Sequence, residues 1–521
     1  MKENKIIYLI TLSPKSHRTS EENLGIEYLK ASLTKNGYRV QIIDAWLNEY
    51  SVEEVYYMLL SKLKEILFVG ISTYMSNTAP TIELIKKLKN IAPSIKIVCG
   101  GFGPTFYPAD YLKEGSDYII RGEGEDAICE LADCILNNNE PLDVANIGLI
   151  YDGKMILNPV RSLNDNLDSF PFPSRDCIDV VLEKKSTVNM VTARGCSGNC
   201  EFCSVISFFR LSDGKIWRTR SIRNIVDEIE MLYKQGITHI KIVDDSFIDG
   251  TRDEKWCEEF ANEIEQRQIK VNLRGQIRAD KVTDSILKNL KRAGFFSFAC
   301  GIENGSQSAL TRMNKKATLE DNKRALELFK KNGYLVQMGY ILFDKNTTLE
   351  ELIENYNFMK EYDFAITKGI FSEMFSAEGT RLNERLKESG ELIESNFISN
   401  NNKYQIDSIQ VKKVYDALKK WHKSHCEIYD MTIDPLTAPK AISKSSMLDF
   451  YRYAMFLKRI DLEIFKKILL IIKENLSLNL MDYVDEEIAK YASSYEKVKE
   501  QVRILYKKND LQYHAETNPF I

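Results

Sequence analysis

The alternation of short β-rich segments with amphipathic helical segments limits the fold of this 521-residue chain more than any other feature. In the first 145 residues, apolar strands and helices with a 3.6-residue period follow one another regularly. We expect strands at 5–11, 39–44, 66–72, 95–99 and 118–121, and helices at 24–36, 80–90 and 126–136. Such alternation favours an α/β fold with an open, doubly wound parallel sheet.

A Rossmann-like sheet of this kind binds ligands beyond the carboxyl ends of its strands. Three of the expected strand ends carry small or glycine-rich sequences, namely Ser72-Thr-Tyr74, Gly100-Gly-Phe-Gly-Pro-Thr105 and Gly122-Glu-Gly-Glu125. Glycine lets the backbone approach a ligand closely because it has no side chain. The sequence therefore predicts a ligand site at this edge of an N-terminal domain spanning 1–145.

A second alternation follows a less regular linker at 146–188, which contains several prolines. Strands are expected at 189–194, 239–244, 270–275, 296–302, 335–342 and 365–373. Six β/α units over 189–395 predict a partial (β/α)6 barrel, in which the chemistry lies at the carboxyl ends of the strands. The C-terminal region 396–521 is expected to be α-helical, with helices at 411–426, 446–460, 462–475 and 484–507.

Charge and composition exclude several classes of protein. Lys plus Arg is 71 and Asp plus Glu is 75, so a net charge of −4 provides no basic field for nucleic acid. No apolar run reaches the roughly 18 residues of a membrane helix, and the first residues lack the apolar core of a signal peptide. We therefore expect a cytoplasmic protein with no membrane or nucleic-acid partner. Disulfides are not expected among its ten cysteines, seven of which are scattered singly.

The other three cysteines form a C-x-x-x-C-x-x-C motif, Cys196, Cys200 and Cys203, directly after the first expected barrel strand. Thiolates are soft ligands that suit iron–sulfur clusters and zinc. Three of them can hold three corners of a cubane and leave the fourth iron without a protein ligand. The alternatives are coincidence or a zinc site that lacks a ligand, and no second C-x-x-C motif lies nearby to complete one.

This motif resembles the signature of the radical S-adenosylmethionine (SAM) superfamily, with Phe202 between the second and third cysteines and six β/α units behind it. The resemblance implies a 4Fe–4S cluster whose open iron binds the amino and carboxylate groups of SAM. One-electron reduction, by a partner such as flavodoxin or ferredoxin, would cleave SAM to methionine and a 5′-deoxyadenosyl radical.

Several residues at the strand ends are similar to positions that contact SAM in this superfamily. Phe202 would lie near the adenine, and Gly339 and Ile341 on the fifth strand resemble a segment that packs against it. Glu303, after the fourth strand, resembles another cofactor-contacting position. Taken singly, each of these could instead be a packing residue or part of a salt bridge.

Charged residues at the second and third strands are the remaining SAM candidates. Asp244 and Asp245 stand where family members commonly have Gly-Gly-Glu, a motif that binds the amino group of the cofactor. Arg274 and Arg278 flank the end of the third strand and could face a carboxylate, as guanidinium groups do.

The N-terminal domain is similar to the cobalamin-binding domain of cobalamin-dependent radical SAM enzymes. The resemblance implies contacts with cobalamin from Ser72, Thr73, Tyr74, Gly100, Gly101, Phe102, Pro104, Thr105, Gly122, Glu123 and Gly124. Tyr74 and Phe102 would reach the faces of the corrin. There is no Asp-x-His-x-x-Gly motif, and His17 is the only histidine near this domain's loops. Cobalamin is therefore expected to bind base-off and without a histidine ligand, the alternative being a domain that no longer binds it.

These resemblances imply a cobalamin-dependent radical SAM enzyme, and we expect a methyltransferase that acts on an unactivated carbon or phosphorus of a small molecule or peptide. One alternative keeps both cofactors but ends in cyclisation or rearrangement without methyl transfer. Another is a non-catalytic corrinoid or electron-transfer protein. A methylthiotransferase is disfavoured because Cys99, Cys129 and Cys134 are badly spaced for a second cluster. No catalytic side chain beyond the cofactor ligands is predicted.

Overall fold

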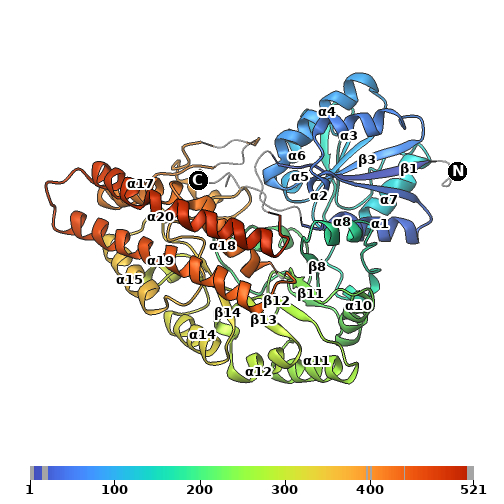
Figure 1. Cartoon of the computed structure of the whole chain (residues 1–521). Coiled ribbons are helices and arrows are strands. Elements are labelled where there is room, and N and C mark those ends of the chain that lie inside the picture. Colours follow the sequence, from blue (N-terminus) through green and yellow to red (C-terminus); the bar gives the residue numbers. More distant parts are fainter. Residues whose placement is uncertain (1–4, 15–20, 395–396, 399–401, 439, 513–521) are drawn as a thin grey trace.

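The structure is a computed structural model that describes residues 5–14, 21–394, 397–398, 402–438 and 440–512. It has an N-terminal α/β domain, a central barrel and a C-terminal helical region (Figure 1). In the view of Figure 1 the α/β domain lies at the upper right and the helical region at the left. The barrel lies below and between them.

The N-terminal domain is built on a seven-stranded sheet with the strand order β2-β1-β3-β4-β5-β6-β7. The first five strands are parallel and the last two antiparallel. The strands are β1 (Ile6–Thr11), β2 (Arg39–Asp44), β3 (Ile66–Ser72), β4 (Ile97–Gly100), β5 (Tyr118–Ile120), β6 (Ile147–Tyr151) and β7 (Lys154–Leu157). Strands β6 and β7 correct our prediction that 146–188 is only a linker, since the sheet continues to Leu157.

Helices cover both faces of this sheet, as the alternation predicted. On one face α1 (Leu24–Lys35) and α7 (Glu125–Leu136) bury Ile26, Leu33 and Leu131 against the strands. The other face is covered by α3 (Val52–Leu60), α4 (Thr78–Ile91) and α6 (Pro108–Lys113), which also bury apolar side chains against the strands. The short helices α2 (Ala45–Asn48) and α5 (Phe102–Phe106) lie at the carboxyl edge. Because the connections after β1 and β3 go to opposite faces, a crevice opens between these strands at that edge.

The barrel contains five parallel strands in the order β14-β13-β12-β11-β8. They are β8 (Val188–Met190), β11 (His239–Ile242), β12 (Asn272–Arg278), β13 (Phe295–Glu303) and β14 (Leu335–Tyr340). The sixth predicted strand, 365–373, forms only two parallel bridges, from Ile366 to Gln337 and from Glu373 to Phe343. The predicted order of units is therefore correct, but the last one is not a regular strand.

Helices surround the barrel strands on the outside. They are α10 (Ile222–Lys234), α11 (Glu254–Gln266), α12 (Asp284–Arg292), α13 (Gln307–Arg312), α14 (Leu319–Lys331) and α15 (Leu349–Glu361). The segment between the two domains contains α8 (Ile178–Glu183), and α9 (Ser204–Phe209) follows the cysteine motif. A small antiparallel pair, β9 (Ala193–Arg194) and β10 (Arg218–Thr219), brackets that motif, and α16 (Arg381–Glu388) ends this part of the chain.

The helical region consists of α17 (Ile409–Lys423), α18 (Cys426–Thr437), α19 (Lys444–Lys473) and α20 (Leu480–Lys508). We had expected helices at 446–460 and 462–475, but α19 runs through both. Asp461 does not break this helix, because its buried carboxylate accepts a hydrogen bond from the Trp421 indole at 2.8 Å. Helix α18 was not predicted, and 411–426 spans the junction between α17 and α18.

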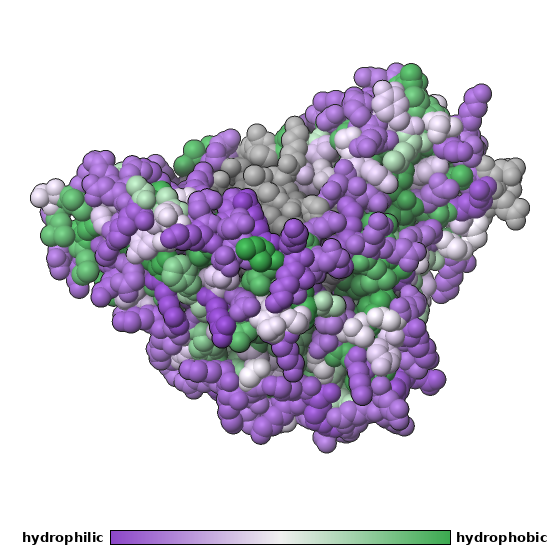
Figure 2. Space-filling view, viewed as in Figure 1, coloured by the Kyte–Doolittle hydropathy of each residue, from purple (hydrophilic) through white to green (hydrophobic). Residues whose placement is uncertain are grey.

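The described residues include no helix that is long and apolar enough to cross a membrane. Most of the face seen in Figure 2 is hydrophilic, with smaller hydrophobic patches between the polar residues.

A buried lysine joins the helical region to the barrel. Lys458 on α19 is 1% exposed, and its amine donates hydrogen bonds to the carbonyls of Tyr362 at 3.2 Å, Asp363 at 3.2 Å and Ala365 at 2.7 Å. Burial lowers the pKa of this amine to about 7. The three hydrogen bonds from this amine attach α19 to the segment just after α15.

We expect Lys458→Met to change how stability depends on pH. An unfolded lysine has a pKa of about 10.4, so between about pH 7 and that value the unfolded chain binds more protons than the folded one. The wild type should therefore gain stability relative to the variant as pH rises through this window, by at most about 1.4 kcal/mol per pH unit. Denaturant unfolding at a series of pH values measures this slope, and Lys466→Met, at an exposed position on α19, is the control. A pH-independent difference between wild type and Lys458→Met would contradict the expectation.

Candidate functional site

The cysteine motif lies on a loop between β9 and α9 whose backbone is fixed where the loop begins. Gly195 precedes Cys196 with a φ of +83°, and a Cβ there would lie 2.0 Å from the Ile216 carbonyl oxygen, so only glycine fits. The Gly195 and Ser197 N–H groups donate to Asp245 and Asp249, each at 2.9 Å. Two carboxylates from the loop after β11 therefore hold the first turn of the cysteine loop.

All three cysteines of this loop are free thiols and partly exposed. The Gly198 N–H donates to the Cys196 sulfur at 3.3 Å. Burial raises the pKa of Cys203 to about 11 and also raises that of Cys200, so bare thiolates are disfavoured there. Iron bonded to the sulfurs would hold them deprotonated and offset this cost. The donor set therefore suits a metal cluster better than free thiols.

Among the described residues, no group of three or more His, Cys, Asp and Glu side chains could hold a single metal ion. In a 4Fe–4S cubane, by contrast, each thiolate binds a different iron. The loop fits such a cluster by its ligand chemistry and by its three-cysteine spacing.

The structure places Phe202 and Ile341 against the same apolar cluster, with Met313 and Met374. Glu303 has a φ of +64°, and its carboxylate forms an ion pair with Lys315 at 2.8 Å. Gly339 lies next to it, since a Cβ there would be 3.6 Å from the Glu303 carboxylate. Four of the predicted SAM positions thus fall in two neighbouring groups at the ends of β13 and β14. Their contact with SAM remains a prediction.

The two predicted aspartates have different surroundings. Asp244 is fully buried and accepts hydrogen bonds from the Thr192 N–H and hydroxyl, and it pairs with Arg252 at 3.3 Å. We therefore correct its assignment, because its carboxylate is used inside the protein. Asp245 instead lines a cavity, where burial and the Asp244 charge raise its pKa to about 6.

Arg274 is also turned into the protein. Its guanidinium donates to the Ser297 hydroxyl at 3.1 Å and the Gln337 amide oxygen at 2.5 Å, on the neighbouring strands. Burial lowers its pKa to about 10, and the Glu21 charge opposes this shift only in part. Arg274 thus brings a buried cation into the barrel, and no cofactor contact follows from its position alone.

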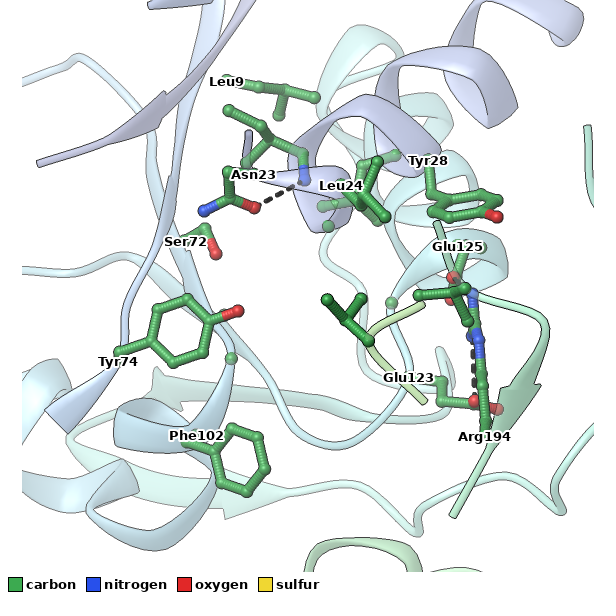
Figure 3. Close-up of a pocket in the computed structure, with 18 of the residues that line it drawn as sticks. Leu9, Asn23, Leu24, Tyr28, Ser72, Tyr74, Phe102, Glu123, Glu125 and Arg194 are labelled. Atoms are coloured by element: carbon green, nitrogen blue, oxygen red, sulfur yellow. Dashed lines mark hydrogen bonds and ion pairs between the residues drawn. The ribbon is translucent and has the colours of Figure 1, made fainter. Parts of the chain in front are cut away.

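A cavity of about 700 Å³ lies between the carboxyl edge of the N-terminal sheet and the barrel. This volume falls within the range usual for small-molecule sites. Figure 3 shows Tyr74 and Phe102 on one side of it, and Tyr28, Glu125 and Arg194 on the other. The barrel contributes Asn189, Val191, Ala193, Lys241, Val243, Asp245 and Lys368.

Aromatic rings from both domains form a continuous wall of the cavity. Tyr74 stacks against Phe102 with ring centres 6.4 Å apart, and Phe102 lies 4.7 Å from Phe208. Trp46 meets the other side of Tyr74 edge-on at 6.2 Å. Phe208 belongs to α9, directly after the cysteine loop, so the wall leads from the sheet to that loop. Trp46 and Phe208 were missed from the sequence, although the Phe-Phe pair after Cys203 was a visible signal.

The predicted cobalamin residues divide between the cavity surface and its support. Ser72, Tyr74, Gly100, Gly101, Phe102, Gly122, Glu123 and Gly124 line the cavity. Thr73, Pro104 and Thr105 are buried and are not among the lining residues, so their contact with cobalamin stays a prediction. The Thr105 hydroxyl donates to the Gly101 carbonyl at 2.6 Å and accepts from the Gly122 N–H at 3.2 Å. Thr105 therefore links two glycine loops by hydrogen bonds, without itself lining the cavity.

Glu123 lines the cavity but its carboxylate already has partners. It binds Arg194 at 2.9 Å and Arg218 at 2.8 Å, and Glu125 also pairs with Arg194. The glycine loop after β5 is thereby joined to β9 and β10, which bracket the cysteine loop. Glu123 therefore links the two domains, and its contact with cobalamin stays a prediction.

The cavity walls suit a large ligand that carries amide groups. A Cβ at Gly101 would lie 2.6 Å from the Thr73 carbonyl oxygen, so the floor there consists of closely crossed backbone. The side-chain oxygen of Asn189 is buried at the cavity without a hydrogen-bond partner in the described part of the chain. It could accept a hydrogen bond from a corrin amide. No described residue that lines the cavity is a histidine, and His17 lies outside the described residues.

Family models match both halves of this site. The B12 binding domain matches residues 17–132, and the radical SAM superfamily matches residues 190–359. Among curated proteins, the chain is 28% identical over 370 residues to an uncharacterised methyltransferase of Pyrococcus horikoshii, which covers 70% of this chain and 78% of that protein. It is also 28% identical over 377 residues to the anaerobic magnesium-protoporphyrin IX monomethyl ester cyclase of Rubrivivax gelatinosus, covering 68% and 66% of the two chains.

A solved structure has the same fold. It is that of the cobalamin-dependent SAM radical enzyme OxsB with aqua-cobalamin and SAM bound. The TM-score is 0.77 at 18% identity, and the match covers 99% of this chain and 83% of that one. The similarity includes the helical region as well as the two domains.

We expect an alanine at Cys196, Cys200 or Cys203 to remove most of the bound iron, because a cubane held by two thiolates loses a corner ligand. Iron and sulfide per chain after anaerobic reconstitution measure the effect. Cys426→Ala, at a partly exposed cysteine outside the motif, is the matched control and should keep its iron. Equal iron in all four variants would contradict this assignment.

Ser72→Trp should prevent corrinoid binding without affecting the iron content. Ser72 ends β3 and lines the cavity, so an indole there would occupy space needed by a ligand. Visible absorbance of the protein after incubation with cobalamin and gel filtration gives the corrinoid content. Ser445→Trp, at an exposed position on α19, controls for the added indole. Full corrinoid binding by Ser72→Trp would place the ligand elsewhere.

Proposed function

We propose that this chain, a member of the cobalamin-dependent radical SAM enzymes by its B12-binding and radical SAM domains, is a methyltransferase. Its substrate would be a small molecule or peptide with an unactivated carbon or phosphorus centre. We place the protein in the cytoplasm, with a flavodoxin or ferredoxin as the electron donor.

The observation that carries the proposal is a single cavity that extends from the glycine loops of the sheet to Arg194 and Phe208, which lie on either side of the cysteine loop in the sequence. Asp245 belongs to both places, because it lines the cavity and accepts the N–H of Gly195, next to Cys196. Phe208 lines the cavity from the helix that follows Cys203. Groups bound at the two ends would face one another in a space enclosed by both domains.

When bound, the cluster with SAM supplies one-electron chemistry and cobalamin supplies a methyl carrier. The chain itself would position the cofactors and exclude water from them. Cys196, Cys200 and Cys203 would hold the cluster, and the aromatic wall of Trp46, Tyr74, Phe102 and Phe208 would exclude water. Such positioning lowers the barrier by fixing reacting groups close together before reaction.

We propose the following cofactor contacts from the positions of the side chains. For SAM we retain Phe202, Asp245, Glu303, Gly339 and Ile341. For cobalamin we retain the lining residues Ser72, Tyr74, Gly100, Gly101, Phe102, Gly122, Glu123 and Gly124. Asp245 lies at the border of the two sites, so its carboxylate would be shared between the cofactors or offered to the substrate.

A second candidate is ring closure or rearrangement with the same cofactors, which the similarity to the cyclase favours. The residues described above would serve either outcome equally, since both need the cluster and cobalamin in one enclosed space. The two functions differ in whether the product gains a methyl group.

The test uses protein reconstituted anaerobically with iron, sulfide and methylcobalamin, and then supplied with SAM labelled on its methyl group and a chemical reductant. For candidate substrates, product mass spectrometry should show the gain of one labelled methyl group. A product that gains no methyl group, labelled or unlabelled, would favour the second candidate. Failure of the reduced protein to cleave SAM would refute both and leave a non-catalytic corrinoid or electron-transfer protein.

A further inference from the structure

Arg278, at the end of β12, directs its side chain to the cysteine loop. Its Nη1 atom lies 3.9 Å from the Cys196 sulfur and donates to the Ser197 hydroxyl at 3.2 Å. A Cβ added at Gly198 would lie 3.4 Å from the same nitrogen, so the glycine leaves room for the guanidinium. The guanidinium therefore reaches the first ligand of the motif from outside the loop.

Two carboxylates hold this guanidinium in place. Asp280 accepts from Nε at 2.9 Å and from Nη2 at 2.8 Å, a two-point contact that fixes the plane of the group. Asp249 lies 3.9 Å from Nη1 and also accepts from the N–H and hydroxyl of Ser197. The Lys281 amine lies 4.0 Å from the other carboxylate oxygen of Asp249. Arg278 is 7% exposed, so solvent screens these charges weakly.

We propose that Arg278, oriented by Asp280, sets the reduction potential of the iron–sulfur cluster held by Cys196, Cys200 and Cys203. It is a positioning and electrostatic residue that contacts the cluster's ligand rather than the substrate. The proposal rests on the cluster in the proposed function, but not on methyl transfer.

The physical reason is the charge that the cluster gains on reduction. The cluster accepts one electron from an external one-electron reductant, and no bond of the chain forms or breaks. A cation beside a ligand sulfur stabilises the added negative charge and makes reduction easier, and a buried carboxylate does the opposite. Hydrogen bonds to cluster sulfurs and local net charge are established controls of such potentials.

Opposite charge changes in this group should therefore shift the midpoint potential in opposite directions. Arg278→Gln removes the cation beside Cys196, leaving Asp280 without this partner and Asp249 with Lys281 alone, so the cluster should become harder to reduce. Asp280→Asn removes one carboxylate and keeps the guanidinium, so the cluster should become easier to reduce. The double variant, which restores the net charge, should lie between the two. A purely structural role would not produce shifts of opposite sign.

The measurement is a mediated redox titration of the reconstituted full-length protein, followed by electron paramagnetic resonance of the reduced cluster. It is made without SAM, and iron and sulfide content are measured for each variant. Arg267→Gln, which breaks ion pairs with Asp227, Glu230 and Glu263 on α10 and α11, is the matched control and should leave the potential unchanged.

Shifts of opposite sign in Arg278→Gln and Asp280→Asn would support the proposal. Unchanged potentials, or shifts of the same sign, in fully loaded variants would overturn it. If Arg278→Gln does not retain iron, Asp280→Asn decides alone, because it removes one negative charge while the Ser197 hydroxyl can still accept from the guanidinium beside Cys196. These outcomes are independent of methyl transfer, because a wild type that titrates normally but yields no methylated product would refute only the proposed function.

Discussion

The ion pairs between the two domains determine how the site is assembled. Glu123 and Glu125 extend from the N-terminal sheet to Arg194, and Glu123 also reaches Arg218. These arginines belong to the two short strands on either side of the cysteine loop. Because the contacts are largely buried, breaking one partner would leave a charge without compensation, which is costly. The glycine loops and the cysteine loop are therefore held facing one another by charge.

Much of the fold could be predicted from the sequence because its signals are local. The bounds of β2 and β3 agree with their hydrophobic patterns to the residue. The sequence missed β6 and β7 because prolines near this segment suggested a linker, although an antiparallel hairpin tolerates such neighbours. It also divided α19 at Asp461, since the indole of Trp421 that donates to one oxygen of this carboxylate is 40 positions away.

The site was predicted less well, because the sequence signals are local and do not show which side chains pair in the folded protein. Glycines and small residues at strand ends identified the cavity, but not which polar side chains face it. Asp244 and Glu123 have the expected chemistry and position, yet Arg252 of the same loop pairs with Asp244, and Arg194 and Arg218 of β9 and β10 pair with Glu123. Arg278 was noticed only as a possible carboxylate partner, because its approach to Cys196 depends on how β12 packs against a loop 82 residues earlier. Long-range pairing of this kind leaves no periodic signal in one sequence.

The cavity has one wall from each domain, and this has a thermodynamic consequence. A ligand that touches both walls binds only the arrangement in which the domains are docked, so its binding free energy adds to the stability of that arrangement. At a ligand concentration of about 100 times the dissociation constant, the gain is about 2.7 kcal/mol. The corrinoid would then act as a structural component as well as a reagent. A cell short of it would hold a less stable protein, and the amount of enzyme would follow the supply of its cofactor.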